Sequence, residues 1–117
     1  MAEESIFIKI MKGDIPADLV YQDDHCICVK DINPQAPTHV LIVPRKPIQR
    51  LADASAADKM LLGHLMLKAG DIARLLGVEE AFRIVINNGE GAGQTVFHLH
   101  LHLLADKTFS ENSLGLN

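Results

Sequence analysis

Three histidines at alternate positions mark the segment from residue 98 to residue 104. His98, His100 and His102 alternate with leucines in the order His-Leu-His-Leu-His-Leu-Leu. Because alternate residues of an extended strand share a face, the three imidazoles are expected to line one side of a strand while the leucines enter the core. A neutral imidazole can act as a nucleophile, a proton carrier or a metal ligand near neutral pH. The segment therefore predicts a strand face that carries out chemistry.

A glycine-rich loop directly precedes the histidines. Gly89, Gly91 and Gly93 permit tight backbone turns, whose successive N–H groups can bind an anion such as phosphate. A phosphate held beside three imidazoles favours attack by one of them on phosphorus, and His100 has a histidine on each side to orient it. Two alternatives remain open from the residues alone. One is a zinc site made by the three histidines, and the other is a solvent-exposed strand face that happens to be rich in histidine.

The same segment resembles the signature of the histidine triad (HIT) family, His-φ-His-φ-His-φ-φ, in which φ is hydrophobic. Further stretches resemble the Hint branch of that family: Ser5–Phe7, Gly13–Pro16, Tyr21–Asp24, Asp31–His39 and Asn87–His102. The resemblance covers most of the chain. It implies a purine nucleoside phosphoramidase, which hydrolyses the P–N bond of an adenosine or guanosine 5′-phosphoramidate through a covalent nucleotidyl-histidine intermediate.

By this resemblance, four histidines form the catalytic set. His100 matches the nucleophile of the family, and His98 and His102 match the flanking members that orient it, stabilise the phosphoryl oxygens and assist the leaving amine. His39 matches a fourth histidine that supports the triad. These groups supply the charge stabilisation themselves, so we expect no metal and no other cofactor. Two alternative functions are a dinucleoside polyphosphate hydrolase and a nucleotide-binding interaction module with little turnover.

The resemblance places the nucleoside against four further residues. The Asp31 carboxylate is expected on the ribose and Asn87 beside the ribose and phosphate, while Ile32 and Phe7 are expected as apolar walls for the base. From the residues alone, Asp31 could instead stabilise the turn of its proline-containing loop, and Asn87 could simply end a strand.

Three residues at the end of the glycine loop are expected on the phosphate side. Gly93, Gln94 and Thr95 match the phosphate and leaving-group positions of the family, with Thr95 where many members have serine. The hydroxyl is retained, although threonine is also an ordinary strand former.

Hydrophobic periodicity predicts two helices. Ser5 precedes apolar residues at helical spacing that end before Gly13, which indicates a short helix capped by Ser5. A longer pattern runs from Ser55 to Leu76, with Asp58 placed as in a capping box. Strand-type residues form five further segments: Leu19–Tyr21, Cys26–Lys30, Val40–Val43, Phe82–Asn87 and Thr95–Leu104.

Length and composition fit a single HIT-like domain over residues 1–117. Since strands and helices do not alternate regularly, the elements predict an α+β fold, a mainly antiparallel sheet of about five strands with one long and one short helix. The net charge is −4, with Lys and Arg scattered, which argues against a nucleic-acid partner. The sequence shows no signal-peptide pattern and no apolar run of membrane length, so we expect no membrane association and a cytoplasmic location.

Cys26 and Cys28 share one face of their expected strand and are interpreted as buried free thiols of a reducing compartment. The alternative is a zinc half-site that adds His25, although His25 should project to the opposite face. His64 falls within the long helix beside apolar residues, and we interpret it as a histidine with a structural partner or an exposed one rather than as a catalytic residue.

A second copy of the chain is the expected protein partner. The long helix carries more apolar residues than one buried stripe needs, among them Met60, Leu62, Met66 and Leu67. The resemblance implies a homodimer in which two subunits join their sheets into one continuous sheet.

The C-terminal region departs from the Hint pattern. Many members follow the triad with Gly-Gly-Arg, whereas this chain has Ala105-Asp106-Lys107 and ends with residues 113–117, Ser-Leu-Gly-Leu-Asn. An acidic Asp106 near the site could alter selectivity for charged amines. The leaving group, the physiological substrate and the choice between adenine and guanine are therefore left open by the sequence.

Overall fold

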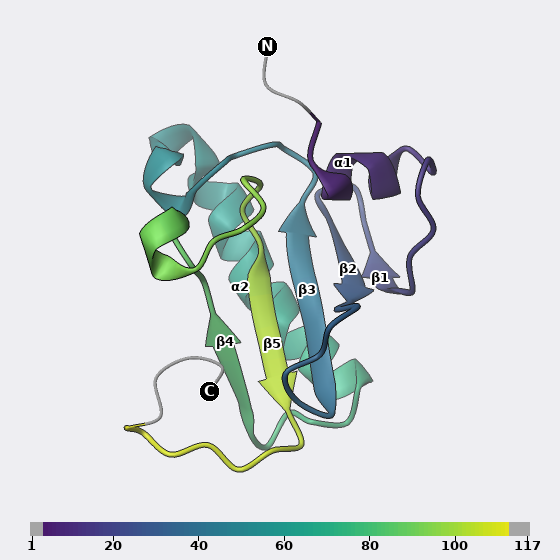
Figure 1. Cartoon of the computed structure of the whole chain (residues 1–117), viewed down its shortest axis with the longest axis vertical. Coiled ribbons are helices and arrows are strands. Elements are labelled where there is room, and N and C mark those ends of the chain that lie inside the picture. The colour runs from purple at the N-terminus through teal and green to yellow at the C-terminus, as the bar shows by residue number, and fades with distance from the viewer. Residues whose placement is uncertain (1–3, 113–117) are drawn as a thin grey trace.

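The sheet has five strands in the order β1-β2-β3-β5-β4, and every neighbouring pair is antiparallel (Figure 1). The computed structural model describes residues 4–112. The strands are β1 (Leu19–Gln22), β2 (Cys26–Lys30), β3 (Thr38–Pro44), β4 (Phe82–Val85) and β5 (Leu101–Ala105). This order confirms the expected α+β fold. It also sets β3 beside β5, so that His39 and His102 lie on neighbouring strands.

Two helices pack on opposite faces of this sheet (Figure 1). α1 (Ile6–Met11) begins at Ser5, whose hydroxyl accepts a hydrogen bond from the Ile8 amide. α2 (Lys59–Leu75) follows a 3-10 turn, η2 (Ala56–Asp58), in which Ser55 and Asp58 form the expected capping box. The predicted start of the short helix and the Ser55 capping box are therefore confirmed, whereas the long α-helix itself begins only at Lys59, after the 3-10 turn that Ser55 caps. In the described part of the chain, no helix is long and apolar enough to cross a membrane.

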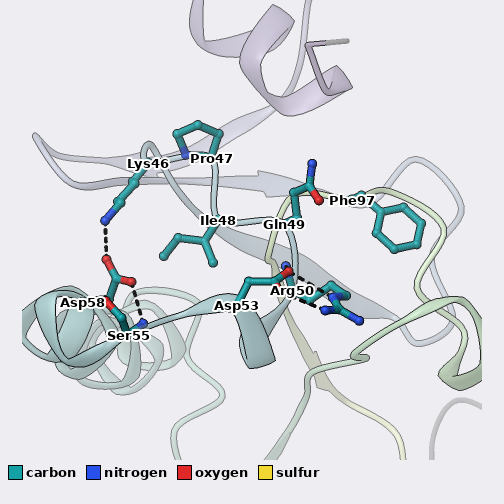
Figure 2. Close-up of a pocket in the computed structure, with 9 residues that line it drawn as sticks. All are labelled: Lys46, Pro47, Ile48, Gln49, Arg50, Asp53, Ser55, Asp58 and Phe97. Atoms are coloured by element: carbon teal, nitrogen blue, oxygen red, sulfur yellow. Dashed lines mark hydrogen bonds and ion pairs between the residues drawn. The ribbon is translucent and has the colours of Figure 1, made fainter. Parts of the chain in front are cut away.

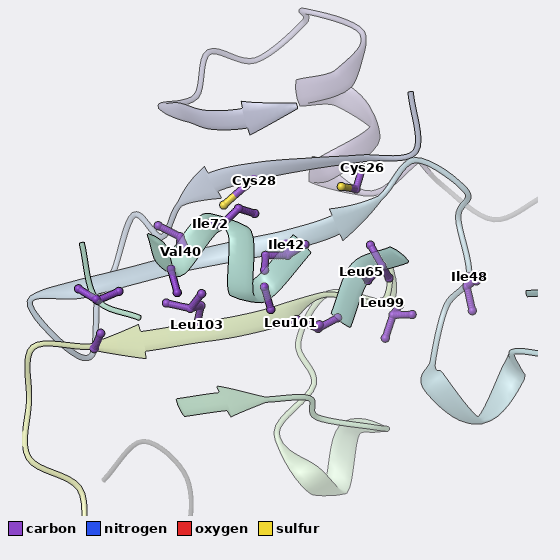
Figure 3. Close-up of a cluster of buried hydrophobic side chains, with 14 residues drawn as sticks. Cys26, Cys28, Val40, Ile42, Ile48, Leu65, Ile72, Leu99, Leu101 and Leu103 are labelled. Carbon is purple, nitrogen blue, oxygen red and sulfur yellow. The ribbon is translucent and has the colours of Figure 1, made fainter. Parts of the chain in front are cut away.

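The larger core lies between the sheet and α2 (Figure 3). Its strand members include Cys26, Cys28, Val40, Ile42, Leu101 and Leu103, and its α2 members are Leu65, Ala69, Ile72 and Ala73. Both cysteines are free and fully buried, as expected. Burial raises the pKa of each thiol to about 12, so neither is a ready nucleophile at neutral pH.

A smaller core lies on the other face, beneath α1. Its buried members are Phe7, Ile27, Val29, Leu41 and Val43. His39 shares a face of β3 with Leu41, and His102 of β5 stands directly opposite Leu41 in the register. The α1 face of the sheet is therefore the face that carries histidines.

The strand predicted over Thr95–Leu104 was too long, because β5 begins only at Leu101. Residues before it bond to the connection that follows β3 instead of extending a ladder. The Leu99 amide, for example, donates to the Ile48 carbonyl at 2.7 Å. Leu99 nevertheless enters the same core as Leu101 and Leu103 of β5, although it lies outside the ladder.

Other predicted limits shift at the ends of elements. The strand expected over Phe82–Asn87 ends at Val85, and the one expected over Val40–Val43 extends to Thr38 and Pro44. Ladder pairing decides where a strand ends, whereas hydropathy indicates mainly its centre.

Candidate active site

The three triad histidines lie on the α1 face of the sheet. His102 belongs to β5, while His98 and His100 lie in the irregular segment just before it. The intervening Leu99 and Leu101 enter the core under α2. His98, His100 and His102 are only 1 %, 8 % and 9 % exposed, so all three imidazoles sit in a largely water-excluded environment.

Both ring nitrogens of His98 have partners from distant parts of the chain. Nε2 lies 2.7 Å from the Pro44 carbonyl oxygen, and because a carbonyl only accepts, Nε2 carries the proton. Nδ1 therefore accepts, and the Ser5 hydroxyl donates to it at 2.9 Å. The same hydroxyl accepts the Ile8 amide at the start of α1. One serine thus caps the helix and fixes the His98 ring.

The proton of His100 is held by the backbone. Nδ1 of His100 lies 2.7 Å from the carbonyl oxygen of His98, so Nδ1 carries the proton and Nε2 keeps its lone pair. The Phe7 ring packs against both imidazoles, with centroids 5.1 Å from His100 and 5.7 Å from His98. A neutral imidazole in this tautomer is the form that can attack an electrophile through Nε2.

His39 and His102 form a hydrogen-bonded pair. The Gln35 amide donates to Nδ1 of His39 at 3.0 Å, so the proton of His39 is on Nε2. The Nε2–H of His39 donates to Nδ1 of His102 at 2.9 Å. The Asp31 carboxylate lies 3.4 Å from Nε2 of His39. Nδ1 of His102 is therefore an acceptor, and the remaining proton of His102 is on Nε2.

Burial keeps the supporting histidines neutral. Desolvation lowers the pKa of His98 and of His39, and together with repulsion from His100 and His39 it lowers the pKa of His102 to about 4. The Asp31 carboxylate opposes the shift at His39 and His102 without reversing it. At neutral pH these three side chains are uncharged, and hydrogen bonds decide which nitrogen holds each proton.

The side-chain amide of Gln94 shapes the glycine-rich loop. Gln94 is 2 % exposed, and its Oε1 accepts the Gly89 amide at 2.8 Å. Its Nε2 donates to the carbonyls of Gln49, at 2.7 Å, and Val96, at 3.0 Å. Both protons of the Gln94 side-chain amide are therefore donated to backbone carbonyls. The resemblance implied that this side chain would contact phosphate instead.

The glycines of the loop are required by its backbone at two positions. Gly89 and Gly93 have φ angles of 90° and 97°, in the left-handed region that residues with a Cβ rarely adopt. They flank the short turn η3 (Glu90–Ala92). A Cβ added at Gly93 would lie 3.8 Å from the Asn87 amide, so the structure brings the predicted Asn87 against this loop.

The residues expected around the nucleoside lie at different depths. Asp31 accepts the Asn33 amide at 2.8 Å through Oδ1 while Oδ2 faces His39, so it both stabilises its own turn and reaches the site. Ile32 is 95 % exposed, and Thr95 is also exposed. Phe7, at 4 % exposure, is the buried residue of α1 and packs against the sheet and the imidazoles of His98 and His100.

Three supporting partners were missed by sequence reasoning. The Ser5 hydroxyl was assigned only a helix cap, and the Gln35 amide and the Pro44 carbonyl were not assigned any role at the site. Two of the three partner groups belong to the backbone, and Ser5 is 93 residues from His98. Residue type and spacing therefore held no signal for them.

Metal ligands are available at one edge of the site. Atoms of Asp31, His39 and His102 all lie within 4.8 Å of one another. The sequence alternative of one zinc ion on all three triad histidines does not match this set, because His98 uses both ring nitrogens in hydrogen bonds. An ion on Asp31, His39 and His102 would have to replace the proton that these groups now share.

A hollow of about 720 Å³ adjoins the site between the segment after β3 and the start of α2 (Figure 2). It is lined by Lys46, Pro47, Ile48, Gln49, Arg50, Asp53, Ser55, Asp58 and Phe97. Its cations are paired, Lys46 with Asp58 at 2.5 Å and Arg50 with Asp53 at 2.8 Å. The triad histidines are not among the residues that line this hollow. The carbonyl of Gln49, which does line it, accepts a hydrogen bond from the Gln94 side chain, and this bond connects the hollow to the glycine-rich loop.

A comparison with known families agrees with this geometry. The HIT domain profile matches residues 12–109. The chain belongs to the HIT domain family. This HIT protein is 56 % identical over 110 residues to an uncharacterized HIT-like protein of Synechocystis sp., covering 94 % of this chain and 96 % of that relative.

Solved structures of HIT proteins share the fold. A HIT family hydrolase from Legionella pneumophila has a TM-score of 0.90 at 39 % identity, covering 94 % of this chain and 99 % of that one. A histidine triad nucleotide-binding protein from Candida albicans has a TM-score of 0.78 at 27 % identity, covering 92 % and 85 % of the two chains. The family and fold that the resemblance implied are therefore confirmed.

Proposed function

We propose that this HIT protein is a nucleotide hydrolase of the Hint type, a purine nucleoside phosphoramidase that cleaves the P–N bond of adenosine or guanosine 5′-phosphoramidates. The observation that carries the proposal is the tautomer of His100. Its Nδ1–H is held by the His98 carbonyl, which leaves the Nε2 lone pair for attack on phosphorus. The similarity to a HIT family hydrolase and to a histidine triad nucleotide-binding protein supports this class of activity.

The reaction has two displacements at phosphorus. First, Nε2 of His100 bonds to the α-phosphorus while the P–N bond breaks, and the amine leaves with that electron pair and takes up a proton from solvent. The ring then carries positive charge, which the His98 carbonyl stabilises through Nδ1–H. Second, a water molecule attacks phosphorus and gives up a proton to solvent, while the bond to Nε2 breaks and its electron pair returns to the ring. Nucleoside monophosphate is released and neutral His100 is regenerated.

The supporting residues act on the charge and position of the phosphoryl group. The Nε2–H of His102 serves as a donor to a phosphoryl oxygen, since its Nδ1 is committed to His39. Backbone amides near Gly93 and the hydroxyl of Thr95 complete the phosphate side. His98 keeps its ring fixed between Ser5 and Pro44 and so holds the carbonyl that orients His100.

The nucleoside is proposed to lie toward the loop after β2. Asp31 would bind the ribose, with one carboxylate oxygen already held in place by the Asn33 amide. Asn87 lies beside the glycine-rich loop and would contact the ribose and phosphate. Ile32 offers an almost fully exposed apolar side chain to the base, whereas Phe7 backs the imidazoles.

The activity is tested by hydrolysis of a fluorogenic adenosine 5′-phosphoramidate in the presence of a chelator. Wild type should turn over, and His100→Ala should lose activity by several orders of magnitude, because no other group can form the covalent bond. A diadenosine polyphosphate is the comparison substrate. Faster turnover of that compound would replace the phosphoramidase with a dinucleoside polyphosphate hydrolase, and tight nucleotide binding without turnover would replace it with a binding module.

We also propose that two copies of this chain associate through β4 and α2. β4 is an edge strand of the sheet, with one side unpaired among the described strands. On α2, Met60, Met66 and Leu67 are 85 %, 55 % and 75 % exposed. Light scattering should give a dimer for wild type and a monomer for Leu67→Glu; a wild-type monomer at micromolar concentration would contradict the association.

A further inference from the structure

A second cluster of chemically capable side chains lies on the opposite face of the sheet from the triad. Asp23 is in the turn between β1 and β2, Cys26 is the first residue of β2, and His64 is on α2. Ligand atoms of all three lie within 4.8 Å of one another. Cys26 belongs to the core that faces α2 (Figure 3), so this cluster is separated from the triad by the sheet itself.

We propose that Asp23, Cys26 and His64 form a zinc site that ties the β1–β2 turn to α2. The donor set is one carboxylate oxygen, one sulfur and one imidazole nitrogen. Zn²⁺ accepts all three donor types, whereas Mg²⁺ and Ca²⁺ prefer oxygen alone. The side chains of Asp23 and His64 are 20 % and 27 % exposed, so a water molecule can reach a fourth position while Cys26 stays buried.

The site is already ordered without the ion. His64 Nε2 donates to Asp23 Oδ2 at 2.8 Å, and Tyr21 donates its hydroxyl proton to the same oxygen at 2.9 Å. The other carboxylate oxygen of Asp23 accepts the amides of His25, at 2.7 Å, and Cys26, at 2.9 Å. These bonds to the carboxylate place it where the ion needs it, as outer partners do in metal sites.

Charge balance favours a divalent ion at this place. On binding, Cys26 gives up its thiol proton to solvent, and His64 binds through Nε2 as an imidazole whose Nε2 proton has moved to Nδ1 or to solvent. One Zn²⁺ then faces one carboxylate and one thiolate, so the site has no net charge. Two cations lie close to the cluster. Arg45 donates to the Asp23 carbonyl at 2.8 Å, and Lys68, paired with Asp71 at 3.3 Å, also lies 5.3 Å from the centre of the Tyr21 ring. Their positive charges favour the thiolate form of Cys26 that the ion requires.

Cobalt provides a direct spectroscopic test, because a thiolate bound to Co²⁺ gives a charge-transfer band that histidine and carboxylate ligands do not give. Untagged full-length protein is stripped with a chelator and titrated with Co²⁺ under reducing conditions. We expect one equivalent to produce this band in wild type. Cys26→Ser should abolish it, while the matched variant Cys28→Ser, which changes an equally buried thiol two residues along β2, should retain it.

The thermal midpoint separates this site from the triad. Zn²⁺ should raise the thermal midpoint of wild type. It should also raise that of His102→Gln, in which the other possible ligand cluster, Asp31, His39 and His102, has lost a member. It should not raise the midpoint of His64→Gln. Tyr21→Phe should bind the ion about tenfold more weakly, because it removes an outer hydrogen bond. A wild-type titration without a thiolate band, or a band that survives in Cys26→Ser, would overturn the proposal.

Discussion

Each histidine of the triad has its proton placed by a different partner. Ser5 and Pro44 fix His98, and the His98 carbonyl fixes His100. Histidine type and spacing were enough to predict that the three imidazoles share one face, because alternation is a local property of an extended chain. The partners could not be predicted in the same way, because they meet the triad only after α1 and the end of β3 have packed against it.

At this scale, Ser5→Ala is the most informative substitution. It removes the hydroxyl that donates to His98, so we expect turnover to fall about fivefold to tenfold, the equivalent of one hydrogen bond of about 1 kcal/mol. It also removes the α1 cap, which should lower the free energy of unfolding by about 1 kcal/mol. Steady-state kinetics and urea unfolding measure the two effects separately.

Ser55→Ala is the matched control, because Ser55 caps the turn before α2 and its hydrogen bonds in the described part of the chain are made with Ala57 and Asp58, not with a triad histidine. Ser55→Ala should lower the free energy of unfolding by about as much as Ser5→Ala does, and should leave turnover unchanged. Equal losses of activity in the two variants would show that the effect of Ser5 is only structural.

At the scale of elements, the loop before the triad and the connection after β3 are held together as one unit. Gln94 bonds to the Gln49 carbonyl, and the Ala52 amide donates to the Asn88 side chain at 2.8 Å. The helix caps were predictable because they depend on neighbours in sequence. The true start of β5 was not, since it depends on these contacts between segments far apart in the chain.

Gly93→Ala tests whether the loop needs its backbone conformation. Gly93 has a φ of 97°, so a Cβ there should destabilise the protein by about 1–2 kcal/mol and raise KM for the phosphoramidate. The added methyl group itself meets only ordinary contacts, the nearest at 3.8 Å, so the effect comes from the backbone.

Gly91→Ala is the control on the same loop. Gly91 is not among the glycines with positive φ, and a Cβ there meets nothing within 4 Å. The free energy of unfolding of the Gly91→Ala variant should equal that of wild type or be slightly higher. Equal destabilisation by Gly93→Ala and Gly91→Ala in denaturant unfolding would contradict the loop account.

At the scale of the whole molecule, the two faces of one sheet have separate roles. The α2 face holds the larger apolar core, and the α1 face holds a smaller core together with four buried polar histidines, His39, His98, His100 and His102. Keeping His39, His98 and His102 buried and neutral makes folding sensitive to acid, since the unfolded chain binds protons that the folded chain excludes.

Stability should therefore fall as pH decreases from about 6.5 toward 4. The pKa of His102 is lowered to about 4, and those of His39 and His98 are also lowered, so the stabilisation is complete above the unfolded value of about 6.5 and is lost through this window. Each of these histidines lowers the free energy of unfolding by up to about 1.4 kcal/mol for each unit of pH decrease within this window. Urea unfolding at pH 7, 6 and 5 measures the slope.

His102→Gln removes one of these groups and should make that slope shallower, whatever its effect on stability at pH 7. An unchanged slope would show that protonation of His102 does not limit folding in acid. This result would also question the neutral His102 on which the hydrogen bond from His39 depends.

The proposed mechanism requires Nε2 of His100 to become covalently bonded to the α-phosphorus. Mass spectrometry of the protein, quenched within the first turnovers of an adenosine phosphoramidate, detects this bond. We predict an adenylyl adduct on the peptide that contains His100, absent from His100→Ala. Turnover by wild type with no adduct under conditions that slow hydrolysis, or an adduct mapped to His98 or His102, would contradict the account.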